Sequence, residues 1–287
     1  MVTVKLIGGL GNQMFQYAIG RSLAHDLGEK LILDTSFYDR IHVNATPRHY
    51  ELNHLRIQGE VLQRGFFSRY WFYLQELLMK KCPLFFQNYV LERELNYNPA
   101  LFEKRKNLYL DGYWQCEKYF LHNQDIIRQD FQVTTPQSDV NKKWADVIAN
   151  TNSVCIHVRR GDYVTDPGAN QVHGTRGPDY YNKAITYILG KVDKPVFFVF
   201  SDDLEWTKKY ISCPYEVHHM DQNGPDEDYE DLRLMMSCKH FIIANSSFSW
   251  WGAWLGGYKD KIIVCPKNWF NDSEKKTDIV CDSWVRM

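Results

Sequence analysis

The sequence predicts an α/β protein organised as two halves. Short apolar runs with the length of buried strands alternate along the chain with longer segments that have the pattern of helices. In the second half this alternation is regular enough to predict a parallel sheet with helical crossovers. A chain of 287 residues, 44% of them apolar, can bury a substantial core in one large domain or in two of ordinary size.

The first half is expected to begin with a strand, a helix and a second strand. Residues 2–7 form a strand-like run that leads through the glycine-rich residues 8–13 into a helix over 14–27. Gly28 is suited to end that helix, and the next strand is expected over 30–34.

The middle of the chain, residues 36–130, is irregular and rich in aromatic side chains. The polar stretch from Thr134 to Asp139 contains Pro136 and is the best candidate for a connection between the halves. We therefore expect an N-terminal domain over 1–135, a linker over 136–150 and a C-terminal domain over 151–287.

The second half is expected to carry four strands with helices between them. The strands are expected at 153–156, 196–200, 241–244 and 261–264, and the helices at 180–189, near 226–238 and directly after 247.

The most informative segment runs from His157 to Tyr163, with the sequence His-Val-Arg-Arg-Gly-Asp-Tyr. It follows an apolar run, so Arg159 and Arg160 are expected at the carboxyl end of a buried strand, where Gly161 opens a loop. Ligands of α/β sheets bind at such strand ends, and a guanidinium group matches phosphate oxygens. The segment therefore indicates a phosphate or pyrophosphate site. An arginine pair neutralised by surface carboxylates is the alternative.

A second strand end fits the same site. The apolar run 196–200 delivers Ser201, Asp202 and Asp203 at its tip, and a helix is expected to start there. Ser201 or Asp202 is the expected N-cap of that helix.

A third strand end leads from the run 241–244 through Asn245, Ser246 and Ser247 into an apolar helix. The free backbone N–H groups and the dipole of a helix N-terminus attract anions, so the two serines are expected to cap the helix, to bind phosphate, or both. The tryptophans that follow, Trp250, Trp251 and Trp254, are expected in the core.

The glycine-rich residues 8–13 also allow a comparison with dinucleotide-binding loops, which would make the protein an NAD-dependent oxidoreductase. Met14 occupies the position at which such a loop needs a third glycine or an alanine. The segment offers Asn12 and Gln13 instead, whose amides can bind sugar hydroxyls or phosphates. The oxidoreductase is therefore the second hypothesis.

Together these motifs resemble those of the α-1,2-fucosyltransferases of glycosyltransferase family 11, at the size of a bacterial member. The matching segments follow the family's order, at residues 8–18, 157–163, 200–203 and 245–251. The resemblance implies an α/β fold of the GT-B type, with two Rossmann-like halves that face a cleft and a donor site mainly in the C-terminal half. It also implies an inverting transferase that needs no metal and moves L-fucose from GDP-β-L-fucose to the 2-hydroxyl of a terminal galactoside, in the synthesis of a bacterial surface polysaccharide such as O-antigen.

The resemblance implies roles for individual residues. Arg159 is expected to stabilise the charge that grows on the β-phosphate as GDP leaves, which makes it the main catalytic residue. Arg160 is expected to contact the same phosphate or to hold the loop, and His157 to donate or accept a hydrogen bond on the phosphate side. The residues expected to bind the donor are Gly9, Gly11, Asn12, Gln13, Arg160, Ser201, Asp202, Asp231, Asn245, Ser246, Ser247 and Phe248.

Asp231 precedes Ser247 by a spacing that resembles that of the guanine-reading aspartate of related fucosyltransferases. A solvated carboxylate on a helix face is an equally favoured alternative, because the run 226–231 is acidic.

The same run contains Asp226-Glu227-Asp228, a pattern that holds Mn²⁺ in other glycosyltransferases. We discount a metal there, because the pattern is common by chance and the arginines would make the metal unnecessary.

An inverting displacement also needs a group to accept the proton of the acceptor hydroxyl. Asp162 is the leading candidate and Asp166 the second, although Asp162 could equally be the counter-ion of Arg160. The acceptor is expected to be a galactose-terminated oligosaccharide, free or lipid-linked. It is expected to meet the N-terminal half and the loop after the arginines, where Asp166, His173 and Arg176 are candidates.

Composition excludes some classes of partner. The net charge of −1 gives no basic footprint for nucleic acid. The seven cysteines contain no C-x-x-C pair and are expected to be reduced thiols of a cytoplasmic protein. The N-terminal run is too short for a signal peptide, and no apolar stretch reaches the roughly 18 residues of a membrane span.

A glycan-binding module is the non-enzymatic hypothesis, but it would not need an arginine pair at a strand end.

The segment 64–81 combines aromatic residues with a net charge of +3, from four basic residues and one acidic residue. An interfacial segment that touches the inner membrane face would have this composition and would bring the enzyme to a lipid-linked acceptor. An aromatic segment packed in the N-terminal core has the same composition and is the preferred interpretation.

Overall fold

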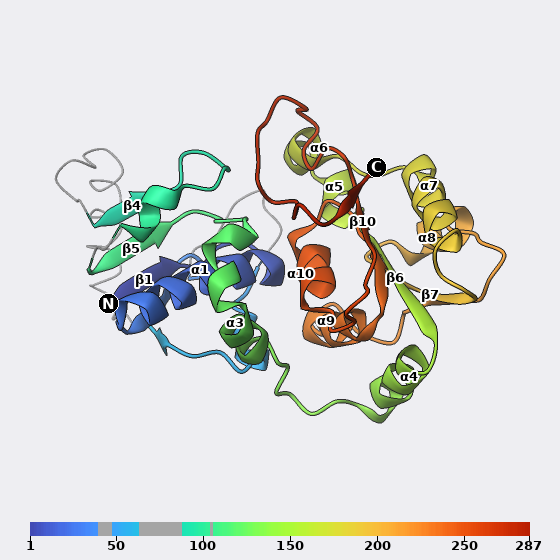
Figure 1. Ribbon diagram of the computed structural model, residues 1–287, viewed down its shortest axis with the longest axis horizontal. Coiled ribbons are helices and arrows are strands. Elements are labelled where there is room, and N and C mark those ends of the chain that lie inside the picture. The colour runs from blue at the N-terminus through green and yellow to red at the C-terminus, as the bar shows by residue number, and fades with distance from the viewer. Residues whose placement is uncertain (40–47, 63–87, 104–105) are drawn as a thin grey trace. The chain divides into compact units, whose positions relative to one another are not determined.

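The computed structural model describes residues 1–39, 48–62, 88–103 and 106–287, and it divides the chain into two compact units (Figure 1). The first unit comprises Met1–Gln132 with Lys276–Ile279, and the second comprises Val133–Lys275 with Val280–Met287. The segment 64–81, for which a membrane contact or a core position is expected, lies outside the described residues.

The first unit contains a five-stranded sheet in the order β3-β2-β1-β5-β4, in which all neighbouring strands are parallel. Its strands are β1 (Val2–Lys5), β2 (Leu31–Asp34), β3 (Glu60–Val61), β4 (Tyr89–Leu91) and β5 (Leu108–Asp111). Its helices are α1 (Leu10–Leu27) and α3 (Gln124–Asp130), with 3-10 helices at Leu52–His54, Pro99–Phe102, Glu117–Tyr119 and Leu121–Asn123.

Helix α1 confirms the expected strand–helix–strand beginning, but it starts at Leu10, about one turn before the expected Met14. Gly9 is its N-cap, so most of the glycine-rich segment belongs to the first turn of the helix. Gly28 ends the helix with a left-handed φ of 61°, and its N–H points back to the carbonyls of Ala24 and His25.

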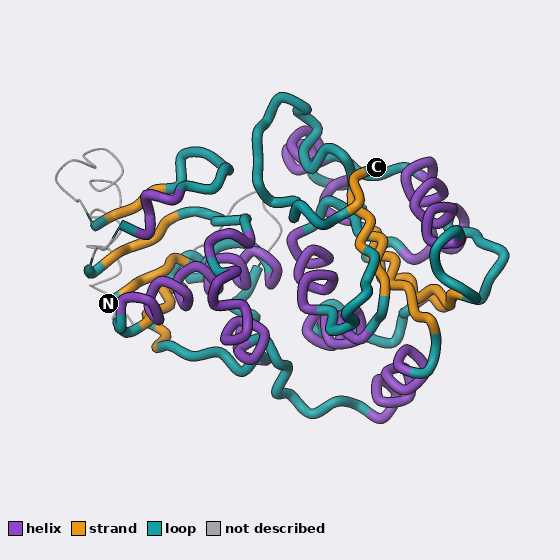
Figure 2. Tube along the Cα trace, in the orientation of Figure 1, coloured by secondary structure: helices purple, strands orange, loops and turns teal. Residues whose placement is uncertain are grey.

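The second unit contains a six-stranded parallel sheet in the order β11-β10-β9-β6-β7-β8. Figure 2 draws the strands in orange and the helices in purple. Its strands are β6 (Asn152–Val158), β7 (Pro195–Ser201), β8 (Val217–His219), β9 (His240–Ile242), β10 (Ile263–Cys265) and β11 (Val285–Arg286). Its helices are α4 (Asp139–Ala149), α5 (Gly161–Thr165), α6 (Pro167–His173), α7 (Pro178–Leu189), α8 (Leu204–Tyr210), α9 (Asp228–Ser237) and α10 (Ser247–Leu255).

Strand β6 is buried on both faces of the sheet. Val154 and Ile156 belong to a core cluster that includes Tyr181 and Ile188 of α7. Alternate residues of a strand point to opposite faces, so Cys155 and His157 face the other layer of helices. Trp250 and Trp251 of α10 are 0% exposed and Trp254 is 4% exposed, which confirms their expected place in the core.

The region expected as a linker, 136–150, contains a helix. Ser138 caps α4 by accepting the N–H of Asn141 through Oγ, at 3.2 Å. The helix buries only Asn141 and Ile148. Its apolar residues nevertheless recur at helical spacing, at Val140, Trp144, Val147 and Ile148, so the sequence carries a helical pattern that the expectation of a linker did not take into account. Strands β3, β4, β8 and β11 were also not expected, because runs of two or three residues at a sheet edge carry little pattern.

The six cysteines in the described part of the chain, Cys116, Cys155, Cys213, Cys238, Cys265 and Cys281, are free thiols. No helix among the described residues has both the length and the apolar composition needed to cross a membrane.

Candidate functional site

Three neighbouring strands carry the polar motifs of the second unit. β6 lies between β9 and β7 and is parallel to both, so the carboxyl ends of these strands meet at one edge. After β8 the chain returns to the other side of β6 to form β9, so the strand order reverses between β6 and β9. Ligands of open α/β sheets bind outside the carboxyl ends of the strands at such a point. This edge is therefore the candidate site.

His157 lies near the end of β6, with its ring centre 5.7 Å from that of Phe248 in α10. Burial lowers the pKa of His157 to about 3, helped by the charge of Arg159, so the ring is neutral at physiological pH. Its Nδ1 is buried and has no hydrogen-bond partner among the described residues. Buried polar atoms are normally paired, so this nitrogen is an exception within the described part of the chain. So weak a base is unsuited to accept a proton from the acceptor.

Arg159 and Asp202 form an ion pair across the ends of β6 and β7, with Nη1 3.1 Å from Oδ2 and each side chain 25% exposed. Asp202 also accepts the backbone N–H of Arg160 through Oδ1, at 2.8 Å. A Cβ atom at Gly161 would lie 2.7 Å from Asp202 Oδ2, so glycine is needed for this approach. Asp202, expected to bind the donor, therefore supports the arginine loop.

The guanidinium group of Arg160 contacts two side chains of the protein, those of Asp203 and Trp206. Its Nε donates to Asp203 Oδ2 at 3.0 Å, and its guanidinium carbon lies 4.5 Å from the ring centre of Trp206. Of the two expectations for Arg160, these contacts favour support of the loop over contact with phosphate. Asp203 also accepts the N–H of Trp206 at 3.1 Å and is the N-cap of α8, a role expected of Ser201 or Asp202. Ser201 Oγ accepts the N–H of Asp203 at 2.9 Å and shapes the turn.

The N-terminus of α10 lies just after the carboxyl end of β9. Ser246 is the N-cap, and its side chain makes no capping hydrogen bond. The N–H groups of a first helical turn have no acceptor within the helix, and the helix dipole adds positive potential there. With Phe248 of this turn against His157, the helix end at Ser246 and Ser247 suits a phosphate group.

Asn245 was expected to contact the donor, but its side-chain amide is occupied by the protein. Its Oδ1 accepts Arg176 Nε at 3.2 Å, and its Nδ2 donates to the carbonyls of His173 at 2.9 Å and Trp269 at 3.0 Å. The His173 ring stacks on that of Tyr163, with ring centres 4.8 Å apart. Asn245, Arg176 and His173 therefore join the end of β9 to the loops around α5 and α6, a role that spacing along the chain does not reveal.

The candidates for the general base lie in and after α5. Asp162 is the second residue of this short helix, and the position of its side chain is outside the described atoms. Asp166 Oδ1 accepts the N–H of Gly168 at 2.8 Å, at the start of α6. The assignment of the base to Asp162 stays a prediction.

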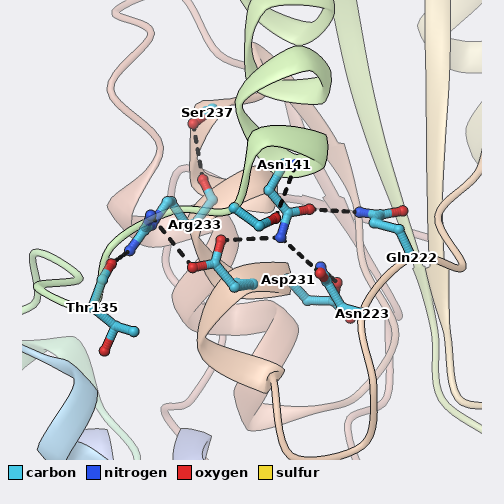
Figure 3. Close-up of polar contacts among 9 residues, drawn as sticks. Thr135, Asn141, Gln222, Asn223, Asp231, Arg233 and Ser237 are labelled. Atoms are coloured by element: carbon cyan, nitrogen blue, oxygen red, sulfur yellow. Dashed lines mark hydrogen bonds and ion pairs between the residues drawn. The ribbon is translucent and has the colours of Figure 1, made fainter.

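Asp231 lies in the first turn of α9 and is linked to a chain of side-chain amides (Figure 3). Asn223 Nδ2 donates to Asp231 Oδ1 at 2.7 Å. The pKa of Asp231 is raised to about 7, mainly by burial and also by nearby acidic groups led by Asp228, against the lowering effect of the hydrogen bond from Asn223. Asp231 is only partly exposed and its Oδ1 is bonded to Asn223, which favours a specific role over that of a solvated carboxylate on a helix face.

The acidic pattern Asp226-Glu227-Asp228 lies at the start of α9. Within the described part of the chain, no three His, Cys, Asp or Glu side chains are grouped so that they could hold a metal ion. The expectation of metal-independent transfer stays a prediction.

The glycine-rich loop of the first unit is held by its own side chains. Gln13 is 0% exposed, and its Nε2 donates to the carbonyls of Gly8 at 3.1 Å and His49 at 2.7 Å. Its Oε1 accepts the N–H of Glu51 at 2.9 Å. These contacts use both donors and the oxygen of the Gln13 amide and favour a structural role over the expected contact with the donor, which stays a prediction.

The other residues of this loop differ from Gln13. Gly9 precedes α1, and Gly11 is buried in its first turn. Asn12 Oδ1 accepts Gln115 Nε2 at 2.8 Å, while its own amide nitrogen has no partner among the described residues. Gly9, Gly11 and Asn12 remain predicted donor contacts.

Sequence reasoning missed several residues that shape the site. Asp203 was noted only as part of the run Ser201–Asp203, although an aspartate directly before a helix is a typical N-cap. Asn223 precedes Gly224 in a pair typical of a turn, but nothing in that pattern indicates a contact with Asp231.

The whole chain, residues 1–287, matches the model of glycosyl transferase family 11. It is 35% identical over 309 residues to an alpha-1,2-colitosyltransferase of Escherichia coli, covering 100% of this chain and 99% of that protein. It is 33% identical to the O-antigen biosynthesis glycosyltransferase WbnK of Escherichia coli, covering 98% and 99%. It is 28% identical to the galactoside 2-alpha-L-fucosyltransferase Sec1 of Mus musculus, covering 90% of this chain and 65% of that protein.

Solved structures share the fold at low sequence identity. A selenomethionine form of the fucosyltransferase NodZ from Bradyrhizobium has a TM-score of 0.52 at 15% identity, covering 88% of this chain and 90% of that chain. A mutant of Arabidopsis thaliana FUT1 in complex with GDP has a TM-score of 0.52 at 13% identity, covering 99% and 75%. Parallel α/β sheets of this kind are consistent with a GT-B-like glycosyltransferase. The chain belongs to glycosyl transferase family 11.

Proposed function

We propose that the protein transfers L-fucose from GDP-β-L-fucose, with inversion, to the 2-hydroxyl of a terminal galactoside. The observation that carries this proposal is the composition of the candidate site in a member of family 11. Arg159, the neutral ring of His157 and the N-terminus of α10 adjoin the reversal of strand order between β6 and β9. The relatives named for α-1,2 transfer support the linkage.

The charges of the site suit departure of a nucleoside diphosphate. As the bond to the sugar breaks, negative charge grows on the β-phosphate, and a guanidinium with helix N–H donors stabilises it without rearranging. Asp202 holds Arg159 at the strand end before the donor arrives, with Arg160 anchored beside it. The proton of the acceptor hydroxyl goes to Asp162 in this proposal, because a His157 with a pKa of about 3 does not retain it.

The acceptor in this proposal is a galactose-terminated oligosaccharide of a bacterial surface polysaccharide. One similar protein is named for O-antigen biosynthesis, and an enzyme of that class working on GDP-sugars would act in the cytoplasm. The first unit and the loop after Tyr163 are proposed to hold the acceptor.

A colitosyl donor is the second candidate, because the Escherichia coli relative of 35% identity is named as a colitosyltransferase. The two donors can be distinguished directly. The purified protein would be incubated with GDP-fucose or GDP-colitose and a panel of galactosides, in the presence of EDTA, and the products analysed by mass spectrometry and NMR. Fucose in α-1,2 linkage to galactose is the expected product. Transfer only from GDP-colitose, or only after Mn²⁺ is added, would contradict the proposal.

A further inference from the structure

The side-chain amides of Gln222, Asn141 and Asn223 form a hydrogen-bonded row that ends at the carboxylate of Asp231 (Figure 3). The four residues come from three segments of the second unit. Asn141 belongs to α4, Gln222 and Asn223 to the loop before α9, and Asp231 to α9 itself. Asn141 is 2% exposed, so the centre of the row is shielded from water.

Each amide in this row has only one orientation that satisfies its neighbours. Glu230, which is paired with Arg233, accepts a hydrogen bond from the Asn141 nitrogen. Asn141 must therefore turn its Oδ1 the other way, where Gln222 Nε2 donates to it at 3.1 Å. The Asn141 nitrogen donates to Asn223 Oδ1 at 2.7 Å and to Glu230 Oε2 at 3.2 Å. Asn223 must therefore direct its own nitrogen at Asp231, where it donates to Oδ1 at 2.7 Å.

The row is fixed to the protein beside Asp231. Glu230 is 2% exposed and also pairs with Arg233, whose Nη1 lies 3.4 Å from Glu230 Oε1. Arg233 in turn donates to the carbonyl of Thr135. The segment Thr135–Asn141 and the first turn of α9 are therefore bound as one unit, which leaves Asn223 little freedom to turn its amide over.

The charged groups that act on Asp231 oppose its ionisation. Asp228, Glu227 and Glu230 all raise its pKa, in addition to the larger effect of burial. The thiol of Cys155 in β6 lies near it, but burial raises the pKa of that thiol well above its ordinary value and keeps it neutral. Asn223 supplies a donor that favours the carboxylate form and leaves Oδ2 unoccupied by the described residues.

We propose that Asn223 is a positioning residue for recognition of the nucleotide base. Oriented by Asn141, it holds Asp231 as a carboxylate, so that Oδ2 and the remaining lone pair of Oδ1 can accept the N1–H and amino groups of guanine. This inference rests on the proposed use of a GDP-sugar and adds to it a residue that selects the base without touching it.

The test measures the affinity of the full-length protein for GDP and for ADP by calorimetry between pH 6 and pH 8.5. Both nucleotides carry the same diphosphate, so the effect of its titration on binding cancels in the ratio of the two affinities. In the wild-type protein the preference for GDP should fall as the pH drops through about 7, because protonated Asp231 cannot accept the guanine N–H groups.

Asn223→Leu, which keeps the volume of the side chain but removes the donor, should move this fall to higher pH. A shift of one pKa unit would weaken GDP binding about tenfold at pH 6 and leave it close to wild type at pH 8.5. Asn223→Ser, a smaller change that tolerates a water molecule, should shift the fall in the same direction and serves if the leucine variant does not fold. Ser237→Ala, at the far end of α9, should titrate like the wild-type protein.

A loss of GDP affinity that is equal at every pH would show that Asn223 has only a structural role and would overturn the inference. Asp231→Asn separates this failure from a failure of the proposed function. If Asp231→Asn keeps the wild-type preference for GDP over ADP, Asp231 does not recognise guanine and the base assignment itself is wrong. If it loses the preference while Asn223→Leu titrates like the wild-type protein, only the role of Asn223 is wrong.

Discussion

The polar residues at the carboxyl ends of the two sheets are used differently. In the first unit, the side-chain amide of Gln13 forms hydrogen bonds with three backbone groups. Both carboxylate oxygens of Glu92 accept backbone N–H groups, from Tyr113 and Trp114. In the second unit, His157 Nδ1 is buried without a hydrogen-bond partner, and Asp231 Oδ2 has no partner among the described residues. These two side chains thus each keep an unpaired polar atom, whereas Gln13 and Glu92 hold loops through theirs.

The difference shows that a motif rich in amides or carboxylates does not by itself indicate binding. Incomplete pairing is the property that distinguishes His157 and Asp231. A shifted pKa does not distinguish them, because burial also raises the pKa of the fully paired Glu92. A buried side chain whose hydrogen bonds are all made stabilises the fold. One that leaves a polar atom without a partner lowers the stability of the fold, and a ligand that supplies the partner removes this desolvation penalty.

The largest expected effect comes from Arg159→Ala. Loss of a charge-assisted contact that strengthens as GDP leaves should reduce kcat by about 10²–10³-fold, and Arg159→Lys should not restore it, because the forked geometry is lost. Circular dichroism and thermal unfolding should stay near wild type, since a partly exposed ion pair contributes only about 0–1 kcal/mol. The matched control is Arg286→Ala, at the edge strand of the same sheet. A folded Arg159→Ala protein that retains more than a tenth of wild-type activity would rule out the assignment.

Gln13→Ala tests the opposite use of a polar residue. The His49 carbonyl and the Glu51 N–H would lose the partner that Gln13 supplies, whereas the Gly8 carbonyl keeps the hydroxyl of Tyr38. The free energy of unfolding should therefore fall by about 2–4 kcal/mol in urea titrations. The affinity of the folded protein for GDP should remain within about twofold of wild type, because the Gln13 amide is saturated by the protein. Exposed Gln129→Ala serves as the control for stability. A tenfold loss of GDP affinity with unchanged stability would restore Gln13 as a donor contact.

His157 should make the second unit sensitive to acid. Its pKa is about 3 in the folded protein and 6.5 as an ordinary histidine, so the unfolded chain takes up a proton that the folded chain refuses. The resulting stabilisation is complete above pH 6.5 and is lost as the pH falls towards 3. His157→Gln, which has no titrating ring, should lose stability less steeply between pH 6.5 and pH 4, by about 1.4 kcal/mol per pH unit at most. Parallel pH profiles of unfolding for the two proteins would mean that the ring is solvated.

The smallest effect is expected from the segment 64–81. If these residues touch the inner membrane face, anionic liposomes should sediment the protein at low salt and release it at high salt, while neutral liposomes should not bind it. If they pack in the core, which we prefer, the protein should remain in the supernatant at every salt concentration. Sedimentation that salt does not reverse would fit neither interpretation.

The sequence by itself determined the parallel strand–helix order, the place of the arginine segment at the end of β6 and the family. These features are local: an apolar run followed by glycine and charged residues specifies a strand end wherever that strand is placed in the sheet. The tryptophans of α10 were recognised as core residues for the same reason, because a run of large apolar side chains has few other uses in such a helix.

Only the tertiary structure decided which polar side chains are left with an atom that has no hydrogen-bond partner. Asn245 and Gln13 look like binding residues in the sequence, yet backbone and side-chain groups distant in the chain complete their hydrogen bonds. Asn223 looks like an ordinary turn residue, yet Asn141, 82 residues before it, orients its amide toward Asp231. Hydrogen-bond saturation depends on partners that the fold brings together from distant positions, and no local pattern records those partners.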